Sequence, residues 1–123
     1  MNVKSLYHRT GLEIRPWGYY HNLMEGDGLL VKHITVNPGE KISLQYHQHR
    51  SEYWVVVSGK AFVRNGAKKF HLKPNESTHI LKRAVHRLEN QESEPLHLIE
   101  IQNGDYIGED DIIRLEDSYG RVP

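Results

Sequence analysis

Short runs of apolar residues alternate with polar ones along most of the chain, and turn-forming residues separate the runs. A side-chain period of two is typical of β-strands, whereas an amphipathic helix repeats its apolar positions about every 3.6 residues. No window carries a helical stripe, because Gly, Pro or Asn interrupts every long segment. The pattern predicts strands over residues 29–36, 42–47, 53–58, 60–65, 67–72, 78–81, 86–90 and 96–102.

Turn signals stand between these strands. Pro38-Gly39 suits a type II turn, and Asn65-Gly66 suits a tight hairpin. Many short strands with a turn about every 8–12 residues indicate an antiparallel sandwich or barrel. Residues 112–123 form either a last strand or a terminal arm that covers the barrel. We therefore predict one all-β domain over residues 1–123, with little or no helix.

Composition narrows the class of protein. Lys plus Arg equal Asp plus Glu at 16 each, so no charge footprint indicates a nucleic acid or a membrane surface as partner. The absence of cysteine excludes disulfides, thiolate metal sites and cysteine nucleophiles. No apolar run has the length of a signal peptide or of a membrane span. We expect a soluble, cytoplasmic protein.

Histidines are abundant, at nine, and several gather where a strand is predicted to enter the core. Gln45, His47 and His49 point to one side if the strand that holds them continues. Glu52 opens the next strand, and His86 opens a later one that a barrel can bring alongside. Imidazole, carboxylate and amide groups suit a divalent first-row metal. The alternative is that the histidines are pocket or surface residues hydrogen-bonded to the backbone.

The stretch from residue 39 to residue 59 resembles the first motif of the cupin superfamily. Gly39, His47, Glu52 and Gly59 are in place, and Gln45 stands where the first histidine of the motif usually lies. The resemblance implies a cupin double-stranded β-helix, a small jelly-roll barrel.

The second cupin motif is matched in part by KRAVHRLEN. It supplies His86 and Asn90, while Lys82 and Ala84 replace the usual Pro and Gly. On this resemblance His86 completes the ligand set, and His49 falls outside it as a pocket residue.

A closer resemblance covers residues 15–121. It rests on RPWGYY, SLQYHQHRSEYWVVVSGKA, NESTHI, HRLEN and IEIQNGDYIGEDDIIRLEDSYGR, which are similar to the isomerase domain of type II phosphomannose isomerases. That family implies isomerisation of mannose 6-phosphate to fructose 6-phosphate through an enediol. It also implies one divalent ion on Gln45, His47, Glu52 and His86, with zinc expected first and cobalt, manganese, nickel or iron as alternatives. Tyr53 stands where relatives often carry His.

In that family the isomerase domain is usually fused to a mannose-1-phosphate guanylyltransferase, which this sequence does not contain. A separate guanylyltransferase is therefore a possible partner. We also expect a homodimer built on the N-terminal strands, because residues 15–20 and 29–36 give an apolar, aromatic edge.

Other polar residues are candidates for catalysis and substrate binding. Glu100 is the preferred proton-transfer group and His49 the second choice. Arg50 is expected to act in catalysis and to bind the phosphate. Further substrate contacts are expected from Gln102, Arg114 and Arg121, although the last two can instead pair with Glu116 or Asp117. GEDD, at residues 108–111, is interpreted as a turn.

Two other functions fit the same residues. One is another metal-dependent cupin enzyme, an oxygenase or an enzyme that acts on a different sugar phosphate. The other is a non-catalytic module that binds sugar phosphates, because a fold alone does not establish an activity.

Overall fold

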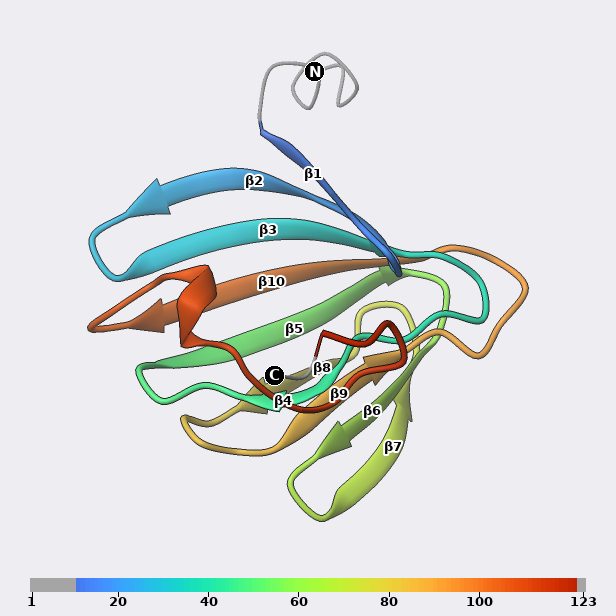
Figure 1. Cartoon of the computed structure of the whole chain (residues 1–123). Helices are drawn as coiled ribbons and strands as arrows, with labels where there is room; N and C mark the ends of the chain where they lie inside the picture. Colours follow the sequence, from blue (N-terminus) through green and yellow to red (C-terminus); the bar gives the residue numbers. More distant parts are fainter. Residues whose placement is uncertain (1–10, 122–123) are drawn as a thin grey trace.

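Two antiparallel β-sheets face each other in the computed structural model, which describes residues 11–121 (Figure 1). The six-stranded sheet has the order β1-β2-β3-β10-β5-β8, and the five-stranded sheet the order β11-β4-β9-β6-β7. The strands are β1 (Leu12–Arg15), β2 (Gly18–Gly26), β3 (Leu29–Val36), β4 (Leu44–Tyr46), β5 (Arg50–Ser58), β6 (Ala61–Asn65), β7 (Lys68–Leu72), β8 (Ser77–Ile80), β9 (His86–Glu89), β10 (Leu96–Gly104) and β11 (Ile113–Glu116).

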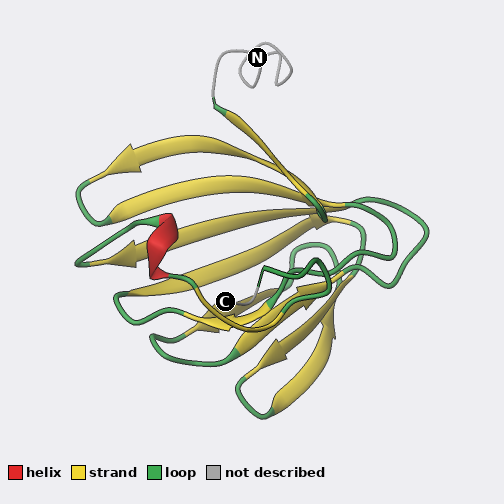
Figure 2. Ribbon diagram, viewed as in Figure 1, coloured by secondary structure: helices red, strands yellow, loops and turns green. Residues whose placement is uncertain are grey.

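The prediction of an all-β barrel with little helix is confirmed. One 3-10 turn, η1 (Glu109–Asp111), is the helical element within residues 11–121 (Figure 2). No helix in the described part of the chain is long and apolar enough to cross a membrane. Residues 113–116 do form a last strand, because β11 pairs with β4 along the edge of the five-stranded sheet. The pattern did not predict β1 and β2.

The core lies between the sheets and changes character along the strands. In β10 the inward-facing residues run from Leu96 and Leu98 to Glu100 and Gln102, all of them buried. Neighbouring strands follow the same order. β3 passes from Val36 to Lys32, and β5 from Val56 to Glu52 and Arg50. The barrel therefore has an apolar end and a polar end where chemistry can occur.

Strand register places the two ends accurately. Leu98 pairs with Val56, whereas Gln102 pairs with Glu52 and Glu100 with Lys32. A fully buried Leu or Val stabilises a fold by about 1.5–3 kcal/mol relative to an exposed one. The apolar end therefore supplies the stability that offsets the cost of burying the polar groups at the other end.

Glycine is required where strands meet closely at the polar end. A Cβ on Gly104 would lie 2.1 Å from the backbone oxygen of His49. Only a residue without a side chain lets the end of β10 approach the start of β5 at Arg50, its partner in the ladder. Gly59 has a φ of 90°, a left-handed conformation that turns the chain out of β5.

Candidate metal centre and its cavity

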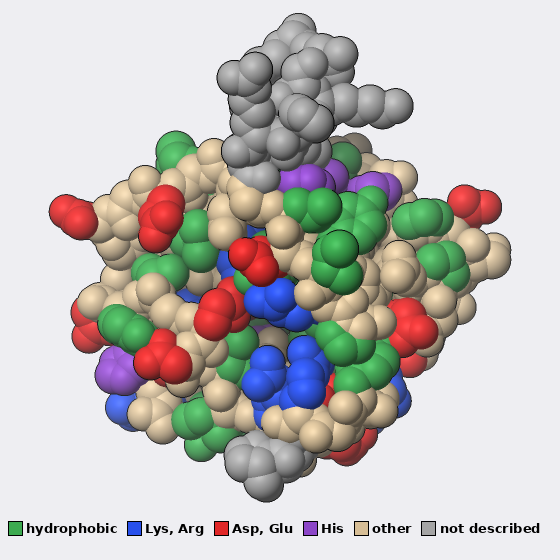
Figure 3. Space-filling model, turned by 45° about the horizontal axis from the view of Figure 1, so that its top comes forward, with side chains coloured by type: hydrophobic (Ala, Val, Ile, Leu, Met, Phe, Trp, Pro, Cys, Tyr) green, Lys and Arg blue, Asp and Glu red, His purple; other side chains and the backbone are tan. Residues whose placement is uncertain are grey.

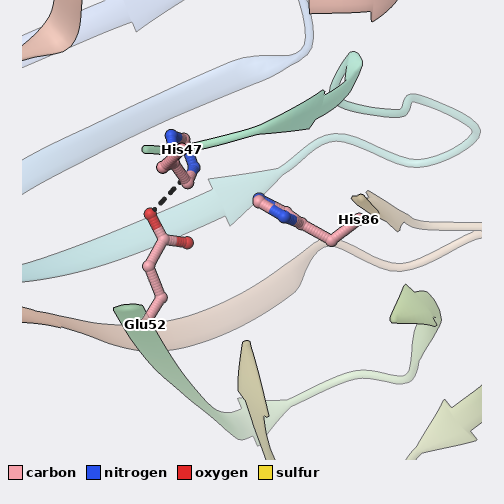
Figure 4. Close-up of side chains that lie close together, drawn as sticks. All are labelled: His47, Glu52 and His86. Carbon is pink, nitrogen blue, oxygen red and sulfur yellow. Dashed lines mark ion pairs between the residues drawn. The ribbon is translucent and has the colours of Figure 1, made fainter. Parts of the chain in front are cut away.

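Three buried residues converge at the polar end of the barrel (Figure 4). His47 follows β4, Glu52 lies on β5 and His86 opens β9, so the two sheets bring them together. One candidate ligand atom from each residue lies within 4.8 Å of the others, and each side chain is at most 2% exposed. The structure thus holds a His/Glu/His group that could bind a metal ion.

Both imidazoles are held by backbone carbonyls on one ring nitrogen. His47 donates its Nδ1–H to the carbonyl of Asp111 at 3.0 Å, and His86 donates its Nδ1–H to the carbonyl of Ala84 at 2.8 Å. In a neutral imidazole this arrangement leaves Nε2 with a free lone pair. The Nε2 of His86 is buried and has no hydrogen-bond partner among the described residues. A buried acceptor left in this state is what a metal ligand requires.

The carboxylate of Glu52 completes the group. Its Oε2 lies 3.2 Å from His47 Nε2 and accepts a hydrogen bond from Arg50 Nε at 2.9 Å. Its Oε1 accepts one from Trp54 Nε1 at 2.9 Å. Burial by itself raises the pKa of Glu52, but the hydrogen bond from Glu100 is the largest of the effects that bring that pKa well below the usual value. Glu52 is therefore ionised.

His86 is neutral for a related reason. Burial lowers its pKa to about 4, and the charge of Glu52 opposes that shift only in part. Two lone-pair nitrogens and one carboxylate form a deprotonated donor set that fits a divalent first-row cation. Gln45 lies beside the group, since it is the ladder partner of His86, and its Oε1 accepts a hydrogen bond from Ser43 at 3.1 Å.

A cavity reaches the metal group at Glu52 and the neighbouring Gln45. Its enclosed volume is about 60 Å³, and its mouth is open to solvent. Lys and Arg side chains gather around a hollow on the face shown in Figure 3. The polar residues of the cavity wall include Arg15, Tyr20, Lys32, Gln45, Arg50, Glu52, Glu100, Gln102, Glu109, Arg114 and Arg121.

Glu100 is the second buried carboxyl group of this cavity. Burial, followed by the negative charge of Glu52, raises the pKa of Glu100 well above its usual value. Gln102 Nε2 donates to Glu100 Oε1 at 3.4 Å. The two carboxyl groups therefore differ in protonation, and Glu100 can hold a proton where Glu52 cannot.

Two arginines from the C-terminal segment close one wall of the cavity. Arg121 forms a two-pronged pair with Asp117, with distances of 2.7 and 3.0 Å. The Nε of Arg114 is buried and has no hydrogen-bond partner among the described residues. Burial and the neighbouring Arg121 lower the pKa of Arg114, which means that the positive charge of Arg114 is disfavoured at this position. An anion bound here would offset the repulsion between the two guanidinium groups and accept a hydrogen bond from the unused N–H of Arg114.

Comparison with known proteins decides the family. A family model described as "Mannose-6-phosphate isomerase C-terminal" matches residues 3–117. The chain belongs to this family. It is 55% identical over 108 residues to the alginate biosynthesis protein AlgA of Pseudomonas aeruginosa, covering 88% of this chain and 22% of that protein. It is 51% identical over 114 residues to a mannose-1-phosphate guanylyltransferase of Salmonella muenchen, covering 92% of this chain and 24% of the relative.

The chain thus spans about a quarter of the length of the curated relatives it matches. Solved structures agree on the fold. The capsular polysaccharide assembling protein CapF of Staphylococcus aureus matches with a TM-score of 0.79 at 18% identity, over 94% of this chain and 35% of that one. An RmlC-like cupin of Shewanella frigidimarina matches with a TM-score of 0.73 at 18% identity, over 84% and 89%.

The structure places most of the residues expected for this isomerase-family domain at one site. His47, Glu52 and His86 form the metal group, and Gln45 lies beside it. The remaining candidates on the cavity wall are Arg50, Glu100, Gln102, Arg114 and Arg121.

His49 is the exception, and its expected place in the pocket is wrong. Its side chain is 49% exposed and its Nδ1 lies 3.7 Å from Asp105. β4 ends at Tyr46 and the chain bends over residues 47–49, so the alternation that would align His49 with His47 is broken.

Arg50 reaches the cavity in an unexpected way. Its guanidinium is buried between Glu52 and the carbonyl of Gly108, to which Nη1 donates at 3.1 Å. The charge of Glu52 raises its pKa against the opposing effect of burial. A phosphate would have to compete with these contacts. The geometry therefore favours a role for Arg50 in orienting Glu52 over a role in binding phosphate.

Residues that carried no motif also line the site. Lys32 Nζ lies 2.7 Å from Glu109 Oε1 and 4.1 Å from the centre of the Tyr20 ring. Tyr20 donates to the same Glu109 oxygen at 2.9 Å. The interpretation of GEDD as a plain turn was incomplete, since this segment forms η1, lines the cavity through Glu109 and buries Asp111. The one sequence feature that could have pointed to these residues is Lys32 itself, a charged residue within the otherwise largely apolar strand β3.

Proposed function

We propose that this protein is a metal-dependent aldose–ketose isomerase that interconverts mannose 6-phosphate and fructose 6-phosphate. The observation that carries the proposal is the pair of buried carboxyl groups. Glu52 is held ionised within the metal group, and Glu100 is held able to carry a proton in the same cavity. Family membership supports the substrate.

The metal is assigned to His47, Glu52 and His86, with Gln45 as a fourth ligand on the resemblance to phosphomannose isomerases. The nitrogen and oxygen donors favour zinc, although cobalt, manganese, nickel and iron also suit them. When bound, a divalent ion would act as a Lewis acid that polarises the carbonyl and hydroxyl oxygens of the open-chain sugar.

Glu100 is assigned the proton transfer. Its carboxylate takes the proton from C2 of the open-chain aldose, which gives an enediolate; a proton passes from the C2 hydroxyl to O1, and Glu100 returns its proton to C1 of the forming ketose. A raised pKa suits a group that must both accept and release a proton near neutral pH. Gln102 orients the Glu100 carboxyl group through its hydrogen bond.

The phosphate is assigned first to Arg114 at the wall of the cavity, with Arg121, which Asp117 already holds, as a second contact. Guanidinium groups bind phosphate oxygens in a bidentate manner, and Arg114 has an unsatisfied donor there. A site that requires a sugar phosphate favours a cytoplasmic location. The relatedness to a mannose-1-phosphate guanylyltransferase supports an enzyme of that kind as partner.

A panel of aldose and ketose phosphates tests the assignment. The zinc-loaded protein should form fructose 6-phosphate from mannose 6-phosphate in a coupled assay and should leave unphosphorylated mannose nearly unchanged. Binding without turnover of any member of the panel would favour a sugar-phosphate-binding module. Oxygen consumption by an iron-loaded sample would favour an oxygenase.

We also propose a homodimer formed through the outer face of the six-stranded sheet. The outward-facing residues of this sheet, at the described positions, include no Asp, Glu, Lys or Arg. They are Leu, Ile, Val, Tyr, Met, Thr, Ser, Asn, Gly and His along β1, β2, β3, β10, β5 and β8. Water-facing sheet surfaces usually carry charges. An uncharged face needs an uncharged partner, and a second copy of the same face supplies one under two-fold symmetry.

Light scattering at tens of micromolar tests the assembly. Ile14 and Val57 are 75% and 54% exposed on this face, so Ile14→Lys and Val57→Lys should keep the fold and produce a monomer. Leu115→Lys, on the other sheet, is the control and should stay dimeric. A monomeric wild type would contradict the proposal.

A further inference from the structure

Residues 47–50, which lead from β4 into β5, are held by η1 and by the residue before it. Asp111 accepts three hydrogen bonds at 3.0 Å. Its carbonyl oxygen accepts from His47 Nδ1, its Oδ1 from the backbone N–H of Gln48, and its Oδ2 from the backbone N–H of His49. The segment that bonds to the loop lies about 60 residues away in the sequence. The shape of the loop therefore depends on a distant residue.

The fourth contact comes from the residue that precedes η1. The carbonyl of Gly108 accepts a hydrogen bond from Arg50 Nη1 at 3.1 Å, while Arg50 Nε holds Glu52. Asp111 is itself buried, with 6% of its surface exposed. A buried carboxylate is costly unless hydrogen bonds satisfy it, and the two loop amides do so.

This arrangement determines which nitrogen of His47 faces the metal group. With Nδ1–H donated to the Asp111 carbonyl, the lone pair of Nε2 points toward Glu52. The hydrogen bonds from the two backbone N–H groups to the Asp111 carboxylate fix the loop against η1. They thereby keep the His47 ring aligned with the Asp111 carbonyl. Partners of this kind behind a metal ligand typically change metal affinity 10- to 100-fold when lost.

We propose that Asp111 is a positioning residue that sets the metal affinity of the site by fixing the loop at residues 47–50 and the tautomer of His47. The inference rests on the proposed metal-binding function of His47, but it does not require isomerase activity. The same segment carries Glu109, which binds Lys32, and leads into β11 with Arg114. One segment thus joins the metal loop to the substrate wall.

Zinc affinity in the full chain tests the proposal, measured by competition with a chromophoric chelator. Asp111→Asn keeps the size and the backbone carbonyl, but its amide NH₂ would oppose one of the two loop N–H donors. We expect the zinc dissociation constant to rise about 10- to 100-fold and the absorption spectrum of the cobalt-loaded protein to change. Asp110→Asn, the exposed neighbour, is the matched control and should match the wild type.

The wild type alone supplies a second measurement, which decides the matter if Asp111→Asn does not fold. In nitrogen-15 NMR of the zinc-loaded protein, His47 should carry a slowly exchanging proton on Nδ1. A proton on Nε2 instead, or zinc affinity within about twofold of the wild type in folded Asp111→Asn, would overturn the proposal. Failure of the isomerase assay with these results intact would affect only the proposed reaction.

Discussion

Replacing Glu100 with Gln separates proton transfer from every other property of the site. Gln is nearly the same size and keeps an oxygen that can accept the hydrogen bond from Gln102. Its NH₂ group can also donate to Glu52, as the protonated carboxyl of Glu100 does. Because the raised pKa already favours the neutral form, Glu100→Gln should change the free energy of unfolding by less than about 1 kcal/mol.

Turnover should change far more. General acid–base catalysis contributes about 10²–10⁴-fold, which corresponds to about 2.7–5.4 kcal/mol of activation free energy. We expect kcat of Glu100→Gln to fall by that factor, with KM for mannose 6-phosphate and zinc content unchanged, because the lost interaction exists only in the transition state.

The assay is coupled formation of fructose 6-phosphate by zinc-loaded protein between pH 5 and 9. In the wild type, kcat/KM should rise with pH as Glu100 loses its proton, and this rise should be absent from Glu100→Gln. Glu89→Gln, on the outer face of β9, is the control for loss of a carboxylate. A Glu100→Gln variant that retains more than about a tenth of the wild-type turnover would refute the assignment of Glu100 as the base.

Three further predictions follow from the same site. His47→Ala and His86→Ala should fold but lose zinc on dialysis, whereas His49→Ala should retain about one ion per chain; elemental analysis that finds zinc kept in His47→Ala would contradict the ligand set. Arg114→Gln should lower kcat/KM for mannose 6-phosphate by about 10- to 150-fold, the worth of a charged hydrogen bond of about 1.5–3 kcal/mol, with Arg64→Gln as control. Burial, His97 and His21 lower the pKa of His33 to about 4, so between that pH and about 6.5 the unfolded chain binds a proton that the folded protein does not. The free energy of unfolding of the metal-free protein should therefore be highest above about pH 6.5 and should fall toward pH 4. Chemical denaturation across that range should show a smaller fall for His33→Gln; an equal fall would show that His33 is not responsible.

Local patterns predicted those parts of the site that lie on regular strands. Glu100 and Gln102 alternate with Ile99 and Ile101, so a period of two placed both carboxyl and amide on the face that turned out to line the cavity. His86 opens a strand, and the barrel brought it to Gln45 as expected. Alternation placed these side chains correctly because β9 and β10 continue without interruption at these residues.

The same rule failed where the backbone leaves the strand. The prediction placed His49 beside His47 by assuming a continuous strand. Instead, the backbone N–H groups of Gln48 and His49 donate hydrogen bonds to the Asp111 carboxylate, and the chain bends there. That partner is distant in sequence, and no local period could reveal it. Lys32 and Glu109 were missed for a similar reason, since each looks like an ordinary surface charge until the fold brings them within 2.7 Å.

Proton exchange at C2 of mannose 6-phosphate tests the central claim most directly. Zinc-loaded protein in deuterated water should replace the C2 proton with deuterium and should release fructose 6-phosphate, both followed by proton NMR, and zinc-free protein should do neither. Saturable binding of mannose 6-phosphate to the zinc-loaded protein with no exchange at C2 and no fructose 6-phosphate would contradict the isomerase assignment.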